Sequence, residues 1–325
     1  MSAIDPTPPP PNPPSAAVPI PPEGRLARLR RNDLWRSFLA HRGAVVGAVL
    51  LAVLITSALM APLIAPQNVF DPRELDLWFS ELPPVWVEGG QWPYILGTDV
   101  QGRDILSAVL YGSRSSILIG FFAVLFSLAI GLAIGLVAGW FGGIVDNLLM
   151  RFGDVLLSIP TILVAILVSS LALQMIPPGW RDVTAGAVLV GAITLSNWVQ
   201  YARIVRAQTA VERKKEYVQA ARLLKVPARR ILAHHILPNT LTPILVAATL
   251  SFGMAILLEA TLSFLGVGMP PSRPSLGTLI RLGNQYLFSG MWWIVLFPVL
   301  QLSLLVIAVN LVGDWLRDAL NPKLR

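Results

Sequence analysis

Few residues in this chain could perform covalent or metal chemistry. Cysteine is absent, which excludes disulfides, thiolate nucleophiles and cysteine metal sites. The histidines are His41, His234 and His235, and the two adjacent ones do not share a helix face, so no metal site is expected. No Ser/His/Asp set or pair of carboxylates converges in the sequence, and we predict no catalytic residue.

A phosphate-binding loop is missing as well. That loop requires Gly-x-x-x-x-Gly-Lys-Ser/Thr. The lysines are Lys214, Lys215, Lys225 and Lys323, and none of them follows a glycine. We therefore expect that the chain is not an enzyme, has no ATP site of its own and binds no cofactor.

Glu259 is the only acidic residue within any of the long apolar runs of the chain. A charge inside a bilayer costs about 2.5–3.5 kcal/mol, so this carboxyl is expected to be paired or to face water. Two interpretations stay open. Glu259 belongs to a transport pathway or gate, or it is a hydrogen-bonded acid near the outer end of its helix.

The segment 216–239 is basic and helix-prone, and lies between two apolar runs. Tyr217, Ala220, Ala221 and Leu224 occur at i, i+3, i+4 and i+7, which places them on one helix face with a charged rim. Pro227 disfavours helix at the residue before it and predicts a turn, followed by a second short helix over 228–235. The segment is either a solvated basic loop or a helix that inserts into a groove on a cytoplasmic subunit.

The elements that must position these residues are membrane-spanning helices. The chain is 54% hydrophobic and 13% charged. Six apolar runs are long enough to cross about 30 Å of hydrocarbon, and backbone groups in lipid must bond internally, as a helix allows. The six predicted spans are 44–64, 115–139, 155–173, 183–202, 241–265 and 291–313. In the second span, Gly131, Gly135 and Gly139 are four apart, which predicts close helix packing within the chain or with a partner.

Lysine and arginine are unevenly distributed between the two sides that six spans define. Most of the 25 fall before the first span, between the fourth and fifth, or after the last. The positive-inside rule places that side in the cytoplasm. We predict that both termini and the segment 216–239 are cytoplasmic, and that anionic lipid, not nucleic acid, accounts for the net charge of +7.

The remaining segments have simpler interpretations. Residues 1–24 contain the tract "PTPPPPNPPSAAVPIPP", typical of a disordered tether. Residues 25–43 are predicted to form an interfacial helix on the membrane surface. Residues 44–66 are predicted to contain the first transmembrane helix, and residues 314–325 to form a cytoplasmic tail. The outer loop 67–114 is rich in tryptophan and is expected to be ordered, as an interfacial aromatic belt or as a docking surface for an external partner.

The stretch "EYVQAARLLKVPARRILAHHILPN" resembles the EAA loop of ABC-transporter permeases, with Ala220 and Ala221 at the alanines and Leu237 and Pro238 at the close. Further stretches are similar to the C-type permease of the dipeptide/oligopeptide/nickel branch: "LGTDVQGRDILSAVLYGSR", "GGIVDNLLMRFGDVLLSIP", "EATLSFLGVGMPP" and "NLVGDWLRDALNPKLR". Gln219 replaces the glutamate of the motif and Lys225 its glycine. This lysine implies that the turn is ordinary helix or that the groove of the partner tolerates a large cation.

The resemblance implies an all-α membrane protein with the type I ABC importer permease fold, located in a bacterial inner membrane. The core permease domain would cover 115–313, with its coupling loop at 203–239. The implied partners are a homologous second permease, two ATPase subunits that hold ATP and Mg, a solute-binding protein and membrane lipid. The implied ATPase-coupling residues are Glu216, Tyr217, Gln219, Ala220, Ala221, Arg222, Leu224, Lys225 and Val226.

The implied function is to form half of a translocation pathway for di- or oligopeptides or a related solute. Three alternatives stay open from the residues alone: an ion-coupled secondary carrier, a non-transporting membrane scaffold, and a permease of the same family that carries nickel, a sugar or another non-peptide solute.

Overall fold

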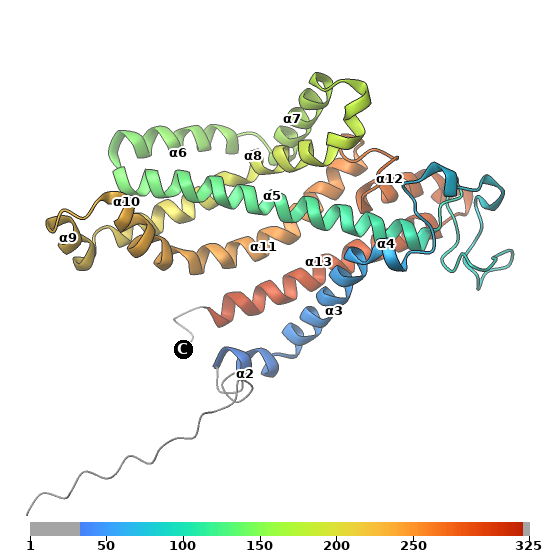
Figure 1. Ribbon diagram of the computed structural model, residues 1–325, viewed down its shortest axis with the longest axis horizontal. Helices are drawn as coiled ribbons and strands as arrows, with labels where there is room; N and C mark the ends of the chain where they lie inside the picture. The colour runs from blue at the N-terminus through green and yellow to red at the C-terminus, as the bar shows by residue number, and fades with distance from the viewer. Residues whose placement is uncertain (1–32, 321–325) are drawn as a thin grey trace, which may run out of the picture.

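The computed structural model describes residues 33–320 (Figure 1), and the proline-rich tail 1–24, residues 25–32 of the predicted interfacial helix and the last five residues lie outside this range. Within it the chain is helical, since apolar backbone in lipid is satisfied best by its own hydrogen bonds. Five helices are long and apolar enough to cross a membrane: α3 (Arg42–Leu59), α5 (Ile105–Phe141), α8 (Pro178–Glu212), the continuous helix Ala228–Phe264 and α13 (Trp293–Ala319).

The third predicted span is wrong as a continuous helix. Two helices, α6 (Gly143–Leu157) and α7 (Thr161–Met175), take its place, with a bend of 88° between them. The break falls at Pro160, which has no N–H for the helix ladder and disfavours helical backbone at Ile159. Together the two helices form either one broken span or a re-entrant loop.

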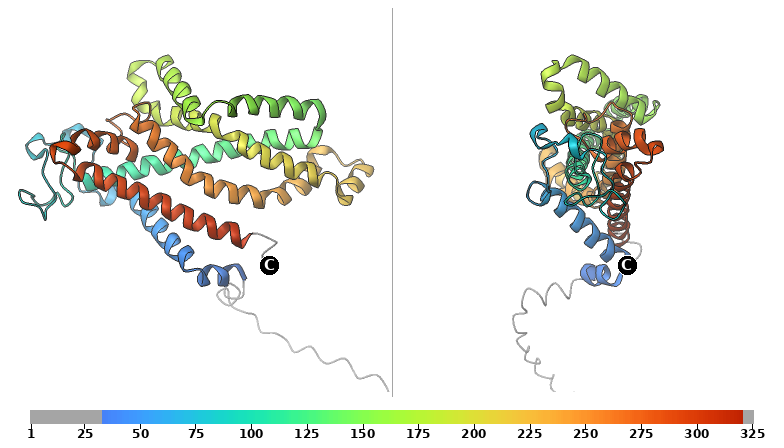
Figure 2. Two further views of the ribbon diagram at one scale, coloured as in Figure 1. Left: turned by 180° about the vertical axis from the view of Figure 1, so that it is seen from behind. Right: turned by 90° about the vertical axis from the view of Figure 1, so that its right-hand side faces the viewer.

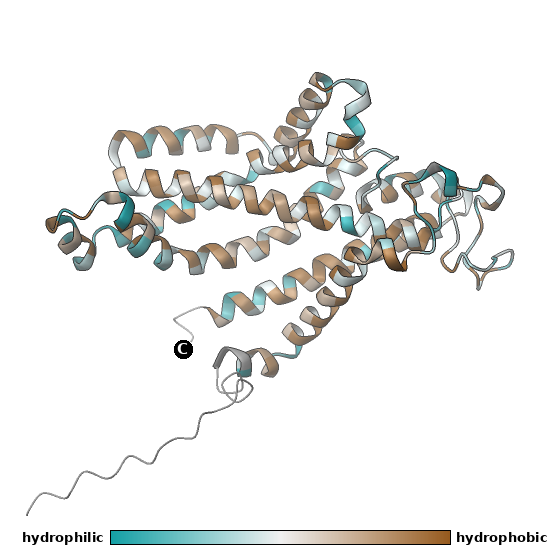
Figure 3. Cartoon of the chain, viewed as in Figure 1, coloured by the Kyte–Doolittle hydropathy of each residue, from teal (hydrophilic) through white to brown (hydrophobic). Residues whose placement is uncertain are grey.

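The helices form a layered bundle. The helices α6 and α7 lie on one face, α3 lies on the opposite face, and α5, α8 and α11 (Leu237–Phe264) lie between them (Figure 2). The short helix α9 (Glu216–Leu223) is at one end of the bundle, and the loop before α5 is at the other (Figure 1). Helix α2 (Asp33–Ala40) and the end of α13 lie between them, on the side of the middle that is nearer to α9. The middle of the bundle is mostly apolar, and α9 carries both hydrophilic and hydrophobic residues (Figure 3).

The glycines of the second predicted span pack within the chain. A Cβ on Gly131 would lie 2.5 Å from the Cβ of Tyr201, and one on Gly135 would lie 2.6 Å from the carbonyl oxygen of Ala202. Gly139 makes the same kind of approach to Thr209. The stripe therefore brings the backbone of α5 against α8 over about two helical turns.

Several predicted boundaries differ from the structure. Helix α5 begins at Ile105 and not at residue 115, because most of its first ten residues are buried by other elements and need no long apolar run. The predicted short helix 228–235 is not separate, since α10 (Ala228–Ile231) and a π-helical turn (Leu232–Ile236) continue into α11. The sequence interpretation missed α12 (Leu276–Tyr286), an amphipathic helix too short to register as a span.

The outer loop is ordered, as its composition predicted. The short helix α4 (Ala61–Ile64) precedes it, and the loop contains two single 3₁₀ turns, Pro72–Glu74 and Leu77–Phe79. The Gln67 side chain donates to the carbonyl oxygens of Glu74 (2.7 Å) and Gly102 (3.2 Å) and accepts from the amide of Asp104 (2.7 Å). One buried amide thus joins the two ends of the loop.

Candidate functional site

Helix α9 is attached to the bundle by its inner face. Val218 is fully buried and packs with Ile231 and Ile236, and Ala221 packs against the same cluster together with Trp140 of α5. Its first turn carries Glu216 and its last turn Arg222, which suits the helix dipole at both ends. The helix therefore forms because its apolar positions are covered by α5, α10 and the turn that leads into α11.

A hydrogen-bonded cluster attaches the start of α9 to two long helices. The Glu212 carboxylate, at the end of α8, accepts from Lys215 Nζ (2.6 Å) and from the Tyr217 hydroxyl. The same hydroxyl accepts from Asn239 Nδ2 (3.1 Å) at the start of α11. Burial and the bond to the carboxylate raise the pKa of Tyr217, so the phenol stays neutral and can donate.

Two arginines attach the same region to α5. The Arg222 guanidinium lies over the ring of Trp140, 4.2 Å from its centroid. Arg213 donates to the carbonyl oxygen of Trp140 (2.8 Å). A cation over an indole face is attracted by about 0.5–1 kcal/mol at exposed sites. Arg222 was expected in a rim facing a partner, and in the structure it contacts this chain's own tryptophan.

The end of α9 is a Schellman motif built on Lys225. Lys225 has φ +56°, its amide donates to the carbonyl of Arg222 (2.9 Å), and the amide of Val226 donates to that of Ala221 (3.1 Å). The predicted turn before Pro227 is therefore confirmed. The interpretation of Lys225 as ordinary helix is wrong, because this lysine adopts the left-handed conformation that favours glycine.

The predicted one-sided face of α9 needs correction. Ala221 lies on the inner side, whereas Ala220 and Gln219 are exposed. The largest exposed apolar side chains are Leu223, 84% exposed, and Leu224, 79% exposed. Leu223 was missed because it falls outside the i, i+3, i+4, i+7 series that starts at Tyr217. The outer surface of α9 consists of Glu216, Gln219, Ala220, Leu223 and Leu224.

Glu259 is fully buried and acts within the bundle. Its carboxyl accepts from the Ser116 hydroxyl of α5 (2.7 Å) and from the Ser263 hydroxyl (2.8 Å). The Ser116 oxygen also accepts from the amide of Leu276 at the start of α12 (3.2 Å). This geometry favours the hydrogen-bonded interpretation, in which the acid joins α11, α5 and α12.

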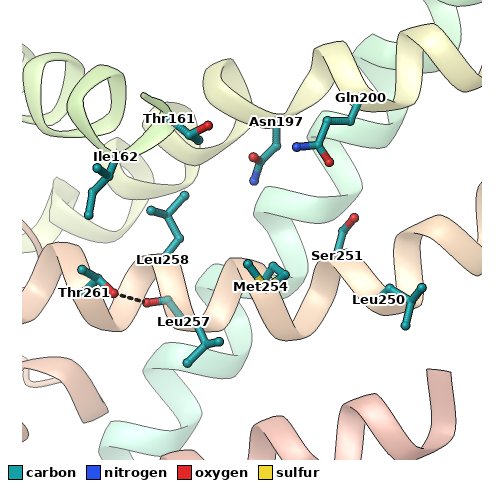
Figure 4. Close-up of a pocket in the computed structure, with 10 residues that line it drawn as sticks. All are labelled: Thr161, Ile162, Asn197, Gln200, Leu250, Ser251, Met254, Leu257, Leu258 and Thr261. Carbon is teal, nitrogen blue, oxygen red and sulfur yellow. Dashed lines mark hydrogen bonds between the residues drawn. The ribbon is translucent and has the colours of Figure 1, made fainter. Parts of the chain in front are cut away.

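A separate cavity of about 510 Å³ lies between α7, α8 and α11, and Glu259 does not line it (Figure 4). Its polar lining comes from Asn197 and Gln200 of α8 and from Ser251 of α11, with Thr161 and Thr261 at one side. The sequence interpretation did not single out these residues. The available signal was the pair of amides at i, i+3 in the least apolar of the candidate spans.

Known proteins match this chain over most of its length. The family model described as "Binding-protein-dependent transport system inner membrane component" matches residues 131–325, and the "N-terminal TM domain of oligopeptide transport permease C" matches 30–84. The dipeptide transport system permease protein DppC of Haemophilus influenzae is 39% identical, covering 90% of this chain and 95% of the relative.

Two further relatives agree. The di/tripeptide transport system permease protein DppC of Pseudomonas aeruginosa is 38% identical, over 90% of this chain and 92% of its own length. The dipeptide transport system permease protein DppC of Escherichia coli is 40% identical, and the match covers 90% of this chain and 93% of the relative. With its apolar helical bundle and this similarity, the chain is a multi-pass membrane protein that belongs to the inner membrane permease components of binding-protein-dependent ABC transport systems.

Proposed function

We propose that this chain forms one half of the translocation pathway of an ATP-driven importer of di- or oligopeptides. The names of the three relatives support peptide as the substrate class. The other half is a homologous second permease, and a solute-binding protein delivers the peptide outside. Trp78, 92% exposed, and Trp92, 76% exposed, in the outer loop suit a docking surface for that protein.

The proposed topology has six spans. Taken as one bent span, α6 and α7 bring the number of crossings to six, which returns the chain to its starting side. The positions of α2, α9 and the end of α13, all away from the outer loop, support this arrangement. The basic residues near those ends support a cytoplasmic location for them. A cysteine in place of Glu88 tests the topology: a membrane-impermeant thiol reagent should label it from outside, and labelling from the cytoplasmic side alone would refute it.

The proposed ATPase contact is the outer surface of α9. The observation that carries this proposal is that Leu223 and Leu224 are exposed at the polar end of the bundle, on a helix fixed to three long ones. An apolar pair in such a place is expected to be covered by a partner. The partner is an ATPase subunit that holds ATP and Mg.

The contacts of α9 provide a route for ATP-driven motion. A displacement of α9 acts on α8 through Glu212, on α11 through Asn239 and on α5 through Trp140. The helices α8 and α11 line the cavity, so a movement at α9 can change the width of that cavity. The direction of this movement depends on the nucleotide state of the ATPases.

The experiment that tests the contact replaces Leu223 and Leu224 together by aspartate. Each leucine contributes roughly 1.5–3 kcal/mol when fully buried, so the double variant should lower ATPase co-purification by well over tenfold and abolish ATP-driven dipeptide uptake in proteoliposomes. The matched control is Ala233→Asp, which adds a charge at an exposed position of the same segment outside α9. Co-purification and uptake equal to those of the unmodified complex would refute the contact.

A further inference from the structure

The cavity between α7, α8 and α11 has an unusual lining for the apolar part of a bundle. Figure 4 shows Asn197 and Gln200 extending from α8 into the space that Ser251 and Met254 border from α11. The remaining wall is mostly apolar and is formed by Ile162, Leu250, Leu257 and Leu258, with the hydroxyl-bearing Thr161 and Thr261 at one side. The volume, about 510 Å³, is within the range of small-ligand sites.

The amides of Asn197 and Gln200 form no side-chain hydrogen bond with any residue that the structure describes. Neighbouring polar residues of α8 differ in this respect. The Ser196 hydroxyl donates to the carbonyl oxygen of Ala192 (2.9 Å), and the Thr194 hydroxyl donates to the carbonyl oxygen of Ala123 (3.4 Å). The two cavity-facing amides therefore lack the partners that these hydroxyls have, whereas Thr261, also in the lining, donates to the carbonyl of Leu257 (2.7 Å).

An unpaired amide in hydrocarbon is costly, because lipid offers it no hydrogen bond. A position in contact with water or with a polar ligand removes that cost. Asn197 is half-buried and Gln200 is exposed, so both can reach such a partner. The unpaired groups thus identify this surface as one that faces an aqueous or substrate-filled space.

The chemistry of the lining selects a class of ligand. Each side-chain amide offers a donor and an acceptor, which is the complement of a peptide group. No charged residue lines the cavity among the described residues, so nothing there selects one sign of charge. Met254, 66% exposed, and the leucines offer an adaptable apolar surface for side chains of different shapes.

We propose that this cavity is this chain's section of the peptide pathway, where Asn197 and Gln200 hydrogen-bond the backbone amides of a passing peptide. This inference rests on the proposed function. Hydrogen bonds from neutral groups contribute only about 0.5–1.5 kcal/mol each, which suits a section that must release its ligand.

The first test uses the absence of cysteine from the chain. Single cysteines at Asn197, Gln200 and Ser251 in the assembled complex should react with a water-soluble thiol reagent, and the dipeptide alanyl-alanine should slow that reaction at least threefold. The matched control is Leu195→Cys, exposed on the other side of α8 and outside the cavity, which should react slowly with or without dipeptide. Cavity cysteines that do not react, or that alanyl-alanine does not protect, would overturn the proposal.

The second test measures uptake of alanyl-alanine by complexes that carry Asn197→Leu or Gln200→Leu. Loss of a hydrogen bond should lower uptake at limiting dipeptide by about threefold to tenfold, with ATPase co-purification unchanged. Gln208→Leu, an amide on α8 outside the cavity, is the control and should transport normally. If the unmodified complex takes up no dipeptide, the proposed function fails; if it does and both leucine variants match it, only this inference fails.

Discussion

The left-handed conformation of Lys225 predicts that Lys225→Gly stabilises the end of α9. The position has φ +56°, and a side chain with a Cβ pays about 1–2 kcal/mol there. Glycine avoids this cost but loses about 0.4–1 kcal/mol through the greater freedom of the unfolded chain. The net gain is roughly 0.5–1 kcal/mol, which lowers the population of the frayed turn by a factor of about two to five.

The assay is amide hydrogen exchange of the purified protein, read at the amides of Lys225 and Val226 that close the motif. Exchange at both sites should slow by that factor in Lys225→Gly. Lys225→Ala removes the charge and the long side chain but keeps a Cβ, so it should bring no comparable protection. Ala220→Gly, at an exposed helical position of α9, should instead speed exchange, because glycine costs about 0.5–1 kcal/mol there. Equal protection in the glycine and alanine variants at position 225 would refute the backbone explanation.

Three further predictions concern the packing of the bundle. Gly135→Leu should lower the thermal midpoint by the equivalent of about 1–3 kcal/mol or prevent folding, whereas Gly191→Ala, with nothing within 4 Å of the new Cβ, should leave it unchanged. Glu259→Leu leaves two buried serine hydroxyls without their acceptor and should cost about 2–3 kcal/mol in thermal stability, with Glu259→Gln less damaging; equal midpoints for these two variants would contradict the hydrogen-bonded role. Tyr217→Phe removes the hydroxyl that bridges α8 and α11, and it should raise exchange in α9 by the equivalent of about 1 kcal/mol; unchanged exchange would show that this bridge does not hold the helix.

The positions of the long helices could be predicted from the sequence because lipid imposes the rule. A run of about 20 apolar residues can be satisfied in hydrocarbon only as a helix, so five of the six predicted runs correspond to long apolar helices. The predicted helix boundaries were wrong where protein, and not lipid, surrounds the helix. Most of the start of α5 and the inner face of α12 are buried by neighbouring protein and not by lipid, so their sequences carry no long apolar signature.

The position of the coupling segment was also readable from local sequence, since its charge, its turn before Pro227 and its motif are all contained in about 24 consecutive residues. The side of α9 that faces outward could not be read from local sequence. Val218 and Ala221 are covered by residues of α5 and of the turn before α11, and no pattern within α9 reveals that cover. Leu223 therefore emerged only from the packing.

The sequence by itself established a helical membrane protein, the place of its charged segment and its family, because each depends on residues that are near one another in the chain. The bend at Pro160, the left-handed Lys225 and the polar cavity required the folded bundle. Thr161, Asn197 and Ser251 belong to three different helices, and they share a cavity only because α7, α8 and α11 converge. A residue's polarity is encoded locally, whereas its unpaired state depends on every neighbour that packing brings to it.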